Sequence, residues 1–470
     1  MENLSHTLVT DLDQTCWQKE LQKIWGSKIS KGIIISAPES GSGKTLFTLS
    51  LLRHLKNRKI RVNSAKIGPD YIDIAFHSFA INKPSMNIDT WAMRDKTLDY
   101  LLEKISADSE LIVVEGVMGL FDGALVNKCF KNGSTASLAE KTGWPIVLIV
   151  DASSMAQSAA ALIKGFMVHN KNLEICGVVF NKVGGLGHRK ILSDALQEHL
   201  PQLKIFGFLP RNINMKLPER YLGLEQASEN QNIELFMDDA AHWLAGNVDI
   251  DALVSEAMPK ICTSSTNSNC QIKPIGQRIA VAKDEAFSFI YESVLQGWSD
   301  AGAEVTTFSP LLGEFPSVFA DSIYLPGGYP ELYASELVAN DFGNKIRSLG
   351  ESGIRILGEC GGYMVLGRGI TDKNGGRFKM AGLLPLETSF EKSNLHLGYR
   401  KVSTLTQSPL GGPGCEFKGH EFHYANIISE TGAKPLFKST NAKGDLLGDA
   451  GMTDGNIAGS FIHLVDQCED

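Results

Sequence analysis

Several features that would assign a protein to a specialised class are missing from this chain of 470 residues. Its eight cysteines include no CxxC pair, so the patterns of zinc ribbons and of thioredoxin-like redox centres are absent. Such scattered cysteines suit a reducing compartment better than a disulfide-bonded scaffold. No uncharged apolar run reaches the length of a membrane span, because the run that begins at Pro145 is interrupted by Asp151.

The N-terminal segment and the net charge bear on the location and the partners of the protein. Residues 1–31 mix acidic, basic and polar side chains and lack the apolar core of a signal peptide. We therefore expect a cytoplasmic protein. The formal net charge of −8 argues against non-specific binding of nucleic acid. As partners we expect small-molecule substrates, with neither nucleic acid nor a membrane. Whether the protein forms a homodimer is left open.

Two segments of the chain alternate short apolar runs with helix-length stretches, which is the pattern of an α/β protein. In residues 31–246 we expect a parallel sheet with helices on both faces. Its strands are expected at Gly32–Ser36, Ile60–Ile67, Leu111–Glu115, Ile146–Val150, Ile175–Phe180 and Ile205–Leu209. Residues 1–30 form an extension without a motif, and the small polar residues within 247–277 indicate a linker.

The second α/β segment, residues 278–470, becomes richer in strands toward its end. Its first strands are expected at Arg278–Ala282, Glu304–Phe308, Ser322–Leu325 and Ile354–Gly358. Later strands are expected at Lys418–Tyr424 and Ile457–Ile462. The chain is therefore expected to hold two α/β domains, joined by the linker.

A glycine-rich loop follows the first expected strand and precedes a helix, which is the setting of a phosphate-binding P-loop. Backbone N–H groups and the helix N-terminus favour phosphate, a lysine adds a positive charge, and a hydroxyl reaches Mg²⁺. Pro38 stands where this pattern usually has glycine, and a plain strand-to-helix turn is the alternative. The expected nucleotide-binding residues are Gly41, Ser42, Gly43, Lys44, Thr45 and, toward the base, Asn181.

Four acidic residues follow expected strands of the same segment, where open α/β sheets bind ligands. Glu115 ends a strand and is the candidate to hold Mg²⁺ together with Thr45. Asp70 and Asp73 follow the second strand, and Asp122 lies in the loop after Glu115. Each of these aspartates alone could equally be a helix cap or a turn residue.

In the second segment a strand runs into Glu-Cys-Gly-Gly and then a helix, which is the form of a nucleophile elbow. The helix N-terminus favours a thiolate at Cys360. Backbone N–H groups of Gly328 and Gly361 are the candidates for an oxyanion hole. The alternative is that Cys360 is a small buried hydrophobe.

A cysteine nucleophile needs a base, and His463 is the best-placed histidine because it follows an apolar strand near the C-terminus. His420 and His423 are the runners-up. Residues three apart on a strand face opposite sides, so at most one of these two points into a given cleft. Their motif is not H-E-x-x-H, and we expect no zinc.

The motifs together resemble a known family. SGSGKT, GPDYID, EGVMGLFDG, LPGGYPELY, GECGGYMVLG, GHEFHY and GSFIHL occur in the order found in the cobyrinic acid a,c-diamide synthases, a group that includes the hydrogenobyrinic acid enzymes. The resemblance covers residues 31 to 467. It implies an N-terminal domain similar to dethiobiotin synthetase and a C-terminal domain similar to class I glutamine amidotransferases. By motif match, Cys360 is the nucleophile and His463 activates it.

The chain departs from these patterns at a few positions. Most class I glutaminases have an acid two residues after the histidine, where this chain has Val465. The family shares this lack, which leaves the third member of a triad open. Ile74 stands where family members often carry proline, and residues 1–30 precede the matched region.

The resemblance implies a glutamine-dependent ligase with ATP as cosubstrate and Mg²⁺. A carboxylate of a corrin attacks the γ-phosphate of ATP, and ammonia released from glutamine at Cys360 displaces the phosphate from the resulting acyl phosphate. The residues expected to orient the substrate are Asp70, Tyr71, Asp73 and Asp122. Alternatives are a nickel-sirohydrochlorin diamide synthase, a cobyric acid synthase, a MinD/ParA-like ATPase switch and a catalytically dead regulatory module.

Overall fold

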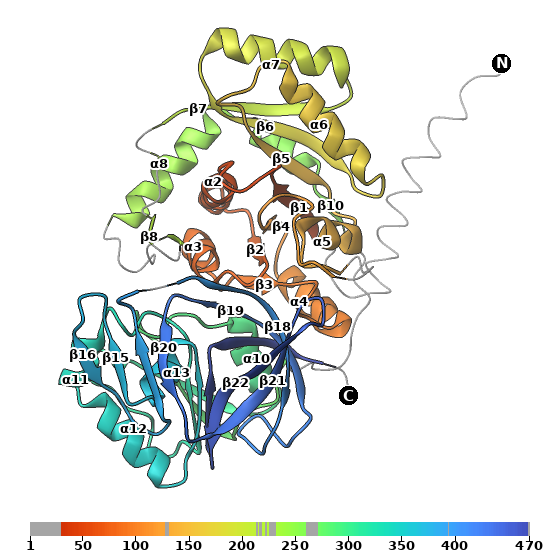
Figure 1. Ribbon diagram of the computed structural model, residues 1–470. Helices are drawn as coiled ribbons and strands as arrows, with labels where there is room; N and C mark the ends of the chain where they lie inside the picture. Colours follow the sequence, from red (N-terminus) through yellow and green to blue (C-terminus); the bar gives the residue numbers. More distant parts are fainter. Residues whose placement is uncertain are drawn as a thin grey trace, which may run out of the picture.

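The computed structural model describes residues 30–126, 131–212, 215, 219–220, 223–224, 232–259, 271–392 and 394–468. The expectations for most of the N-terminal extension and for residues 260–270 lie outside these ranges. Figure 1 shows two α/β bodies, one coloured from red through yellow to light green along the sequence and the other from green through cyan to blue. None of the described helices is long and apolar enough to cross a membrane.

The first body is built on the expected parallel sheet. Its strands follow the order β3-β2-β4-β1-β5-β6-β7, all parallel, and β10 pairs with β1 in the antiparallel sense. Their bounds are Lys31–Ser36 for β1, Val62–Ile67 for β2, Met86–Ile88 for β3, Leu111–Glu115 for β4, Ile146–Asp151 for β5, Ile175–Val183 for β6 and Lys204–Pro210 for β7. The six strands expected from the sequence are confirmed, and β3 was missed because three residues carry no periodicity.

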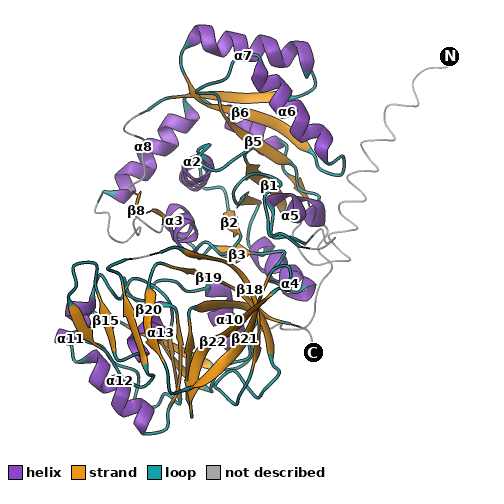
Figure 2. Cartoon of the chain, viewed as in Figure 1, coloured by secondary structure: helices purple, strands orange, loops and turns teal. Residues whose placement is uncertain are grey.

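Helices cover both faces of this sheet (Figure 2). They are α2 Lys44–Asn57, α3 Tyr71–Ile81, α4 Asp95–Ser106, α5 Thr135–Thr142, α6 Ser158–His169, α7 Leu186–His199 and α8 Ile233–Ala245. Strand β8, Glu219–Arg220, pairs with β9, Gly223–Leu224, in the antiparallel sense. Helix α6 is preceded by turns and a bend within residues 153–157.

Part of the stretch assigned to a linker is folded onto the first body. Helix α9 spans Ile250–Ser255 and is capped by Asp249, whose side chain accepts from the Ala252 N–H. Strand β10, Met258–Pro259, then pairs with β1. The described start of the linker therefore packs as part of the first domain, which its polar composition did not reveal.

The second body holds a mixed sheet in the order β12-β11-β13-β14-β23-β22-β21-β18-β19-β24. The strands are β11 Arg278–Ala282, β12 Glu304–Phe308, β13 Ser322–Leu325, β14 Arg355–Glu359, β18 His396–Thr404, β19 Glu416–His423, β21 Lys434–Asn441, β22 Leu446–Asp454, β23 Ile457–Ser460 and β24 Ile462–Gln467. A smaller sheet holds β15 Gly369–Thr371, β16 Arg377–Lys379, β17 Leu386–Ser389 and β20 Asn426–Glu430. The helices are α10 Glu292–Asp300, α11 Ala334–Ala339, α12 Phe342–Glu351 and α13 Gly361–Leu366.

One expected strand near the C-terminus is two strands in the structure. The expected run Ile457–Ile462 breaks at Phe461, so that β23 pairs with β14 whereas β24 pairs with β19 at the far end of the sheet order. His463 consequently lies within β24 and opposite His420, rather than after a strand. The break carries the chain from the strand beside the Cys360 elbow to the strand beside β19.

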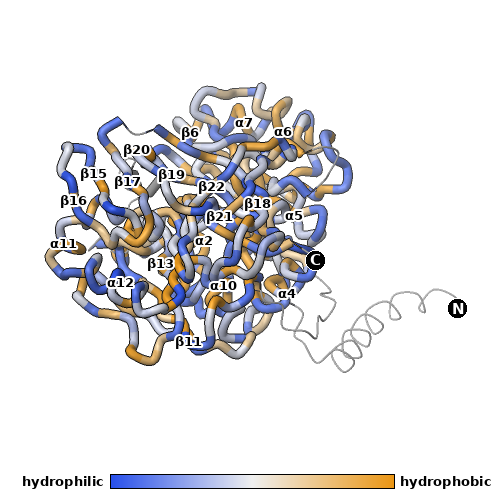
Figure 3. Tube along the Cα trace, turned by 60° about the horizontal axis from the view of Figure 1, so that its bottom comes forward, coloured by the Kyte–Doolittle hydropathy of each residue, from blue (hydrophilic) through white to orange (hydrophobic). Residues whose placement is uncertain are grey.

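The two bodies pack against each other through polar and aromatic contacts. Asp466 of β24 is fully buried and pairs with Arg94 at 2.7 Å. The Tyr399 hydroxyl donates to Asp89 Oδ2 at 2.6 Å, and its ring lies 4.4 Å from that of Trp91. In Figure 3, α2 and β13 lie toward the middle of the molecule, whereas α7, α11 and α12 lie at its periphery. Residues of both bodies share one hydrophobic core.

Candidate active site

The P-loop has the backbone conformation that its glycines permit. Gly41 and Gly43 have φ of 77° and 96°, in the left-handed region that favours glycine. A Cβ on Gly43 would lie 2.2 Å from Asn181 Nδ2, which itself donates to the Ser42 carbonyl at 2.9 Å. Asn181 therefore braces the loop in this structure, and contact with a nucleobase stays a prediction. Lys44 Nζ donates to the Glu39 carbonyl at 3.1 Å.

Next to the loop, a hydroxyl and one buried lysine converge on two acids. Thr45 Oγ1 donates to Glu115 Oε1 at 2.7 Å and lies 3.2 Å from Asp73 Oδ2. Lys66 Nζ pairs with Asp73 at 2.6 Å and with Glu115 at 2.7 Å. His77 Nε2 contacts the second oxygen of Glu115 at 2.7 Å. The structure thus brings together Thr45, Glu115 and Asp73, which the sequence placed in separate motifs.

Burial and neighbouring charges shift the pKa values of Lys66, Glu115 and Lys44 in this network. Burial alone would lower the pKa of Lys66, but Asp73 and Glu115 raise it well above its usual value. Burial would raise the pKa of Glu115, and Lys66 with His77 lowers it instead. Burial and the charge of Lys66 lower the pKa of Lys44 to about 8. Glu115 is therefore held as an ionised carboxylate beside Lys66, and a carboxylate is the kind of ligand that a metal site requires.

A pocket of about 900 Å³ opens over this network and is lined by Lys44, Thr45, Asp70, Asp73 and Glu115, among others. Asp70 caps α3 by accepting from the Ile72 and Asp73 N–H groups. Burial and the neighbouring Asp73 raise the pKa of Asp70 to about 6. The pocket is large enough for a nucleotide.

Two residues expected to orient the substrate occupy other positions. Asp122 Oδ2 accepts from the Gly119 N–H at 2.9 Å and so closes its own loop, which packs on the P-loop through the Leu120 N–H and the Ala37 carbonyl. Tyr71 points toward the second body, where its ring lies 5.1 Å from His463 and 5.3 Å from Phe289. Only Asp70 and Asp73 of the four residues line the pocket over the P-loop.

Cys360 stands at a strained turn between β14 and α13. Its φ of 48° and ψ of −104° place a non-glycine residue in a sparsely populated region, as a nucleophile elbow requires. Cys360 is only 2% exposed, and its Sγ lies 4.0 Å from the Phe422 carbonyl oxygen. Burial is the main cause that raises the pKa of the Cys360 thiol. In this closed arrangement the residue is a thiol.

Glycines pack tightly around the thiol. A Cβ on Gly327 would lie 2.4 Å from His463 Cε1 and 3.2 Å from Cys360 Cβ, so both side chains flank the same backbone. A Cβ on Gly361 would lie 3.0 Å from the Gly328 backbone nitrogen. The two backbone segments expected to form an oxyanion hole are therefore in direct contact, and that role stays a prediction.

His463 is fully buried and is held by rings. His420 stacks on it at 4.9 Å with planes 8° apart, and His420 Nε2 in turn contacts the Tyr291 hydroxyl at 2.7 Å. Neither ring nitrogen of His463 has a hydrogen-bond partner among the described residues. Burial is the main cause that lowers the pKa of His463 well below its usual value, so the ring is neutral in this closed arrangement.

His423 lies in a different cluster from His420, as strand alternation predicts. It stacks on His396 at 4.6 Å with planes 6° apart, and its Nε2 contacts Glu421 at 3.0 Å. His396, Glu421 and His423 have the side-chain types of metal ligands. However, parallel rings do not aim both lone pairs at one ion, and Arg400 already pairs with Glu421.

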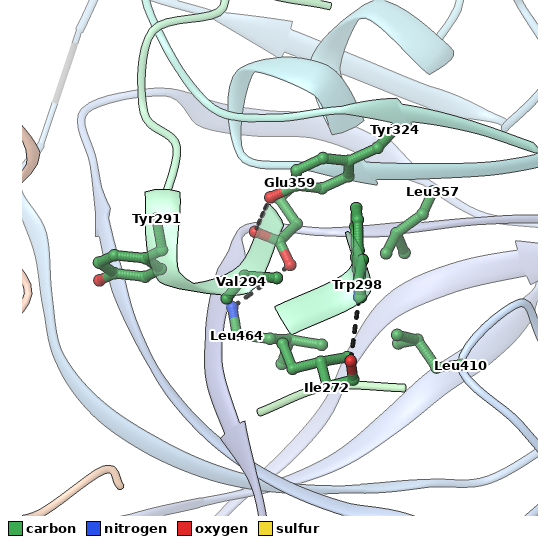
Figure 4. A pocket seen from close by; sticks show the side chains of 9 residues that line it. All are labelled: Ile272, Tyr291, Val294, Trp298, Tyr324, Leu357, Glu359, Leu410 and Leu464. Carbon is green, nitrogen blue, oxygen red and sulfur yellow. Dashed lines mark hydrogen bonds between the residues drawn. The ribbon is translucent and has the colours of Figure 1, made fainter. Parts of the chain in front are cut away.

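The carboxyl beside the nucleophile points away from it. Figure 4 shows Glu359 in a small apolar cavity with Tyr324, Leu357, Leu464 and Trp298. The Tyr324 hydroxyl donates to Glu359 Oε2 at 2.9 Å, and the Leu464 N–H donates to Oε1 at 3.3 Å. Burial raises the pKa of Glu359 to about 8. In its neutral form, Glu359 therefore links the elbow to Leu464, the residue after His463.

This raised pKa makes the stability of the protein depend on pH. The pKa of Glu359 is about 8 in the fold against 4.5 for an unperturbed glutamate, so its contribution is complete below pH 4.5 and is lost as pH rises through 8. We expect Glu359→Gln to remove a slope of up to about 1.4 kcal/mol per pH unit between these values. Denaturant unfolding across the window measures it, with the exposed Glu304→Gln as control. Equal slopes in wild type and Glu359→Gln would contradict the assignment.

Sequence reasoning missed Lys66, His77 and Glu359. Lys66 could have been found, because it is a lysine inside a buried parallel strand, one residue before its end. Glu359 directly precedes the nucleophile and is buried, but its neighbours come from β13 and β24 and carry no local pattern. Val465 is buried in the core, and the adjacent Asp466 is engaged by Arg94 at the contact between the bodies.

Known proteins match both bodies. Residues 33–224 match the CobQ/CobB/MinD/ParA nucleotide binding domain, and residues 278–468 match the CobB/CobQ-like glutamine amidotransferase domain. The chain is 45% identical over 439 residues to the hydrogenobyrinate a,c-diamide synthase of Rhizobium meliloti, covering 93% of this chain and 100% of the relative. The enzyme of the same name from Rhodobacter capsulatus is 42% identical over 436 residues, covering 93% and 98%.

A solved structure, that of the hydrogenase maturation factor HypB from Archaeoglobus fulgidus, aligns with a TM-score of 0.27 and 15% identity, covering 50% of this chain and 100% of that one. A similarity this low carries no argument about function.

A nucleotide-binding P-loop domain followed by a cysteine glutaminase domain defines a glutamine-dependent, amide-forming ligase. The similarity to hydrogenobyrinate a,c-diamide synthases extends over almost the whole length of these relatives, and it identifies one family within this class. The chain belongs to the hydrogenobyrinate a,c-diamide synthase family.

Proposed function

We propose that this protein uses ATP and glutamine to convert the a- and c-acetate carboxylates of hydrogenobyrinic acid, or of its cobalt form cobyrinic acid, into amides for cobalamin biosynthesis. The observation that carries the proposal is the contact between two reactive centres in one chain. A phosphate-binding pocket with Lys44 and Glu115 lies in one body, and Cys360 with His463 lies in the other, with the Tyr71 ring of the first body against His463.

In the P-loop pocket the carboxylate of the substrate becomes electrophilic. A carboxylate does not form an amide directly, because oxide is too poor a leaving group. Its oxygen attacks the γ-phosphate of ATP, the bond to ADP breaks, and an acyl phosphate forms. Lys44 and the N–H groups of the loop hold the phosphate charge. Asp70 and Asp73 orient the acceptor side chain from α3, with Tyr71 and Asp122 fixing the surrounding loops.

The residues at the pocket fit a magnesium ion. Thr45 and Glu115 offer a hydroxyl and a carboxylate, which are oxygen ligands that Mg²⁺ prefers. When bound, Mg²⁺ neutralises charge that develops on the phosphate oxygens. Lys66 pairs with the carboxylates of Asp73 and Glu115 and so holds them in position.

At the elbow, Cys360 attacks the side-chain amide carbon of glutamine while His463 accepts the thiol proton. The C–N bond breaks, His463 returns the proton to the leaving nitrogen, and a thioester and ammonia result. The N–H groups of Gly328 and Gly361 stabilise the oxyanion. Water then hydrolyses the thioester, and ammonia displaces phosphate from the acyl phosphate in the other body.

Mass spectrometry of products tests the proposal and its choice of macrocycle. Hydrogenobyrinic acid, cobyrinic acid and nickel-sirohydrochlorin are each offered with ATP, Mg²⁺ and glutamine. We expect a loss of about one mass unit per amide, with two amides on the first or second acid and one ADP per amide. Amidation of nickel-sirohydrochlorin alone would assign the protein to the nickel branch, and no amidation of any acid would contradict the proposal.

A further inference from the structure

The two centres are separated by a thin layer of aromatic side chains. Tyr71 is the first residue of α3, between Asp70 and Asp73, which line the P-loop pocket. On the other side the Tyr71 ring lies 5.1 Å from His463. Gly327 connects His463 with Cys360, because a Cβ there would touch both residues. The path from the thiol to the phosphate pocket therefore runs past a single ring of the first body.

Phe289 completes this layer from the second body. Its ring stacks on Tyr71 at 5.3 Å with planes 9° apart and lies 5.0 Å from Tyr329 and 6.3 Å from His463. Its N–H donates to the Gly327 carbonyl at 2.9 Å, which fixes it beside the thiol. Phe289 is 3% exposed and takes no part in the chemistry proposed above.

Outside this layer lies a cleft through which nitrogen could be lost. It has a volume of about 520 Å³, runs between α3 and residues 283–292, and is lined by both Tyr71 and Phe289. Its other walls include Ile72, Phe79 and Ile290. Tyr71 and Phe289 thus both border the cleft. His463 lies against the Tyr71 ring in the interior.

We infer that Tyr71 and Phe289 form the partition across which ammonia passes between the two centres, and that Phe289 is a positioning residue that closes this passage to the cleft. The inference rests on the proposed function. Neutral ammonia crosses an aromatic layer more readily than ammonium, because a charged ion would lose its hydration there. On the other side of the two stacked rings, α3 carries Asp73 into the P-loop pocket, and Phe289 prevents escape to solvent.

The ratio of glutamine consumed to amide formed tests the inference. For wild type we expect a ratio near one. For Phe289→Ala we expect it to rise at least about threefold, because ammonia leaks into the cleft, while synthesis supported by external ammonium stays within about twofold of wild type. Phe289→Leu, which keeps most of the volume, should restore the ratio, and the exposed Phe319→Ala is the matched control.

The possible results distinguish a failure of the inference from a failure of the proposed function. A ratio near one in Phe289→Ala, with its ammonium-supported rate intact, overturns the partition. No amide from wild type with either nitrogen source overturns the proposed function instead. If Phe289→Ala loses ammonium-supported synthesis or unfolds at lower temperature, Phe289→Val is read by the same ratio, and an unchanged ratio there also overturns the partition.

Discussion

We expect Cys360→Ser to abolish amidation with glutamine and to leave amidation with ammonium salt intact. We expect the glutamine-supported rate to fall at least about 1,000-fold, because a serine hydroxyl at this buried elbow is a far weaker nucleophile than the thiol that His463 deprotonates. The ammonium-supported rate should stay within about twofold of wild type, because external ammonia bypasses the elbow. Initial rates of ADP release with each nitrogen source, in the presence of the corrin acid, measure both quantities.

Cys415→Ser is the matched control for this experiment. Cys415 is a partly buried free cysteine next to β18 and β19, far along the chain from the elbow. It should leave both rates unchanged. Retention of glutamine-supported activity in Cys360→Ser would show that another residue attacks glutamine. Loss of both activities would show that Cys360 is structural.

We expect Lys44→Met to remove the ATP-dependent amidation and to leave the hydrolysis of glutamine intact. Lys44 is buried beside Thr45 and Glu115, where it is the lysine of the P-loop. Its removal should lower amidation at least about 1,000-fold with either nitrogen source, because the charge on the transferred phosphate loses its closest cation. Glutamine hydrolysis at Cys360 should persist, since the elbow belongs to the other body. Thioester turnover is followed by glutamate release without ATP.

Lys190→Met controls for the loss of a lysine, because Lys190 is exposed on α7 and pairs with Asp194 of its own helix. It should retain both activities. If Lys44→Met kept ammonium-supported amidation, phosphate transfer would not occur at the P-loop. A thermal unfolding curve like that of wild type excludes a general loss of structure.

Local patterns predicted the parts of each centre that lie on one stretch of chain. The P-loop follows from its glycines between a strand and a helix, and the elbow follows from Glu359-Cys360-Gly361 in the same setting. The first residues of the expected linker were not recognised as α9 and β10, because six and two residues are too short for periodicity.

Contacts between distant segments could not be predicted from one sequence. Tyr71 was expected to orient the substrate together with Asp70 and Asp73, which stays a prediction, and the packing of its ring on Phe289 and His463 of the second body was not foreseen. The direction of a side chain at the first turn of a helix depends on what packs there, and no spacing in the sequence encodes it. The same reason hid Lys66, whose partners Asp73 and Glu115 come from two other elements.

The origin of the nitrogen in the product tests the central account most directly. The protein is given glutamine labelled with ¹⁵N at the side-chain amide, together with an equal concentration of unlabelled ammonium in solution, and the amides are analysed by mass spectrometry. Because ammonia made at Cys360 passes inside the protein to the P-loop pocket, we expect the amides to carry the label well above its share in the free ammonium. Amides with the same label content as the free ammonium would contradict the account.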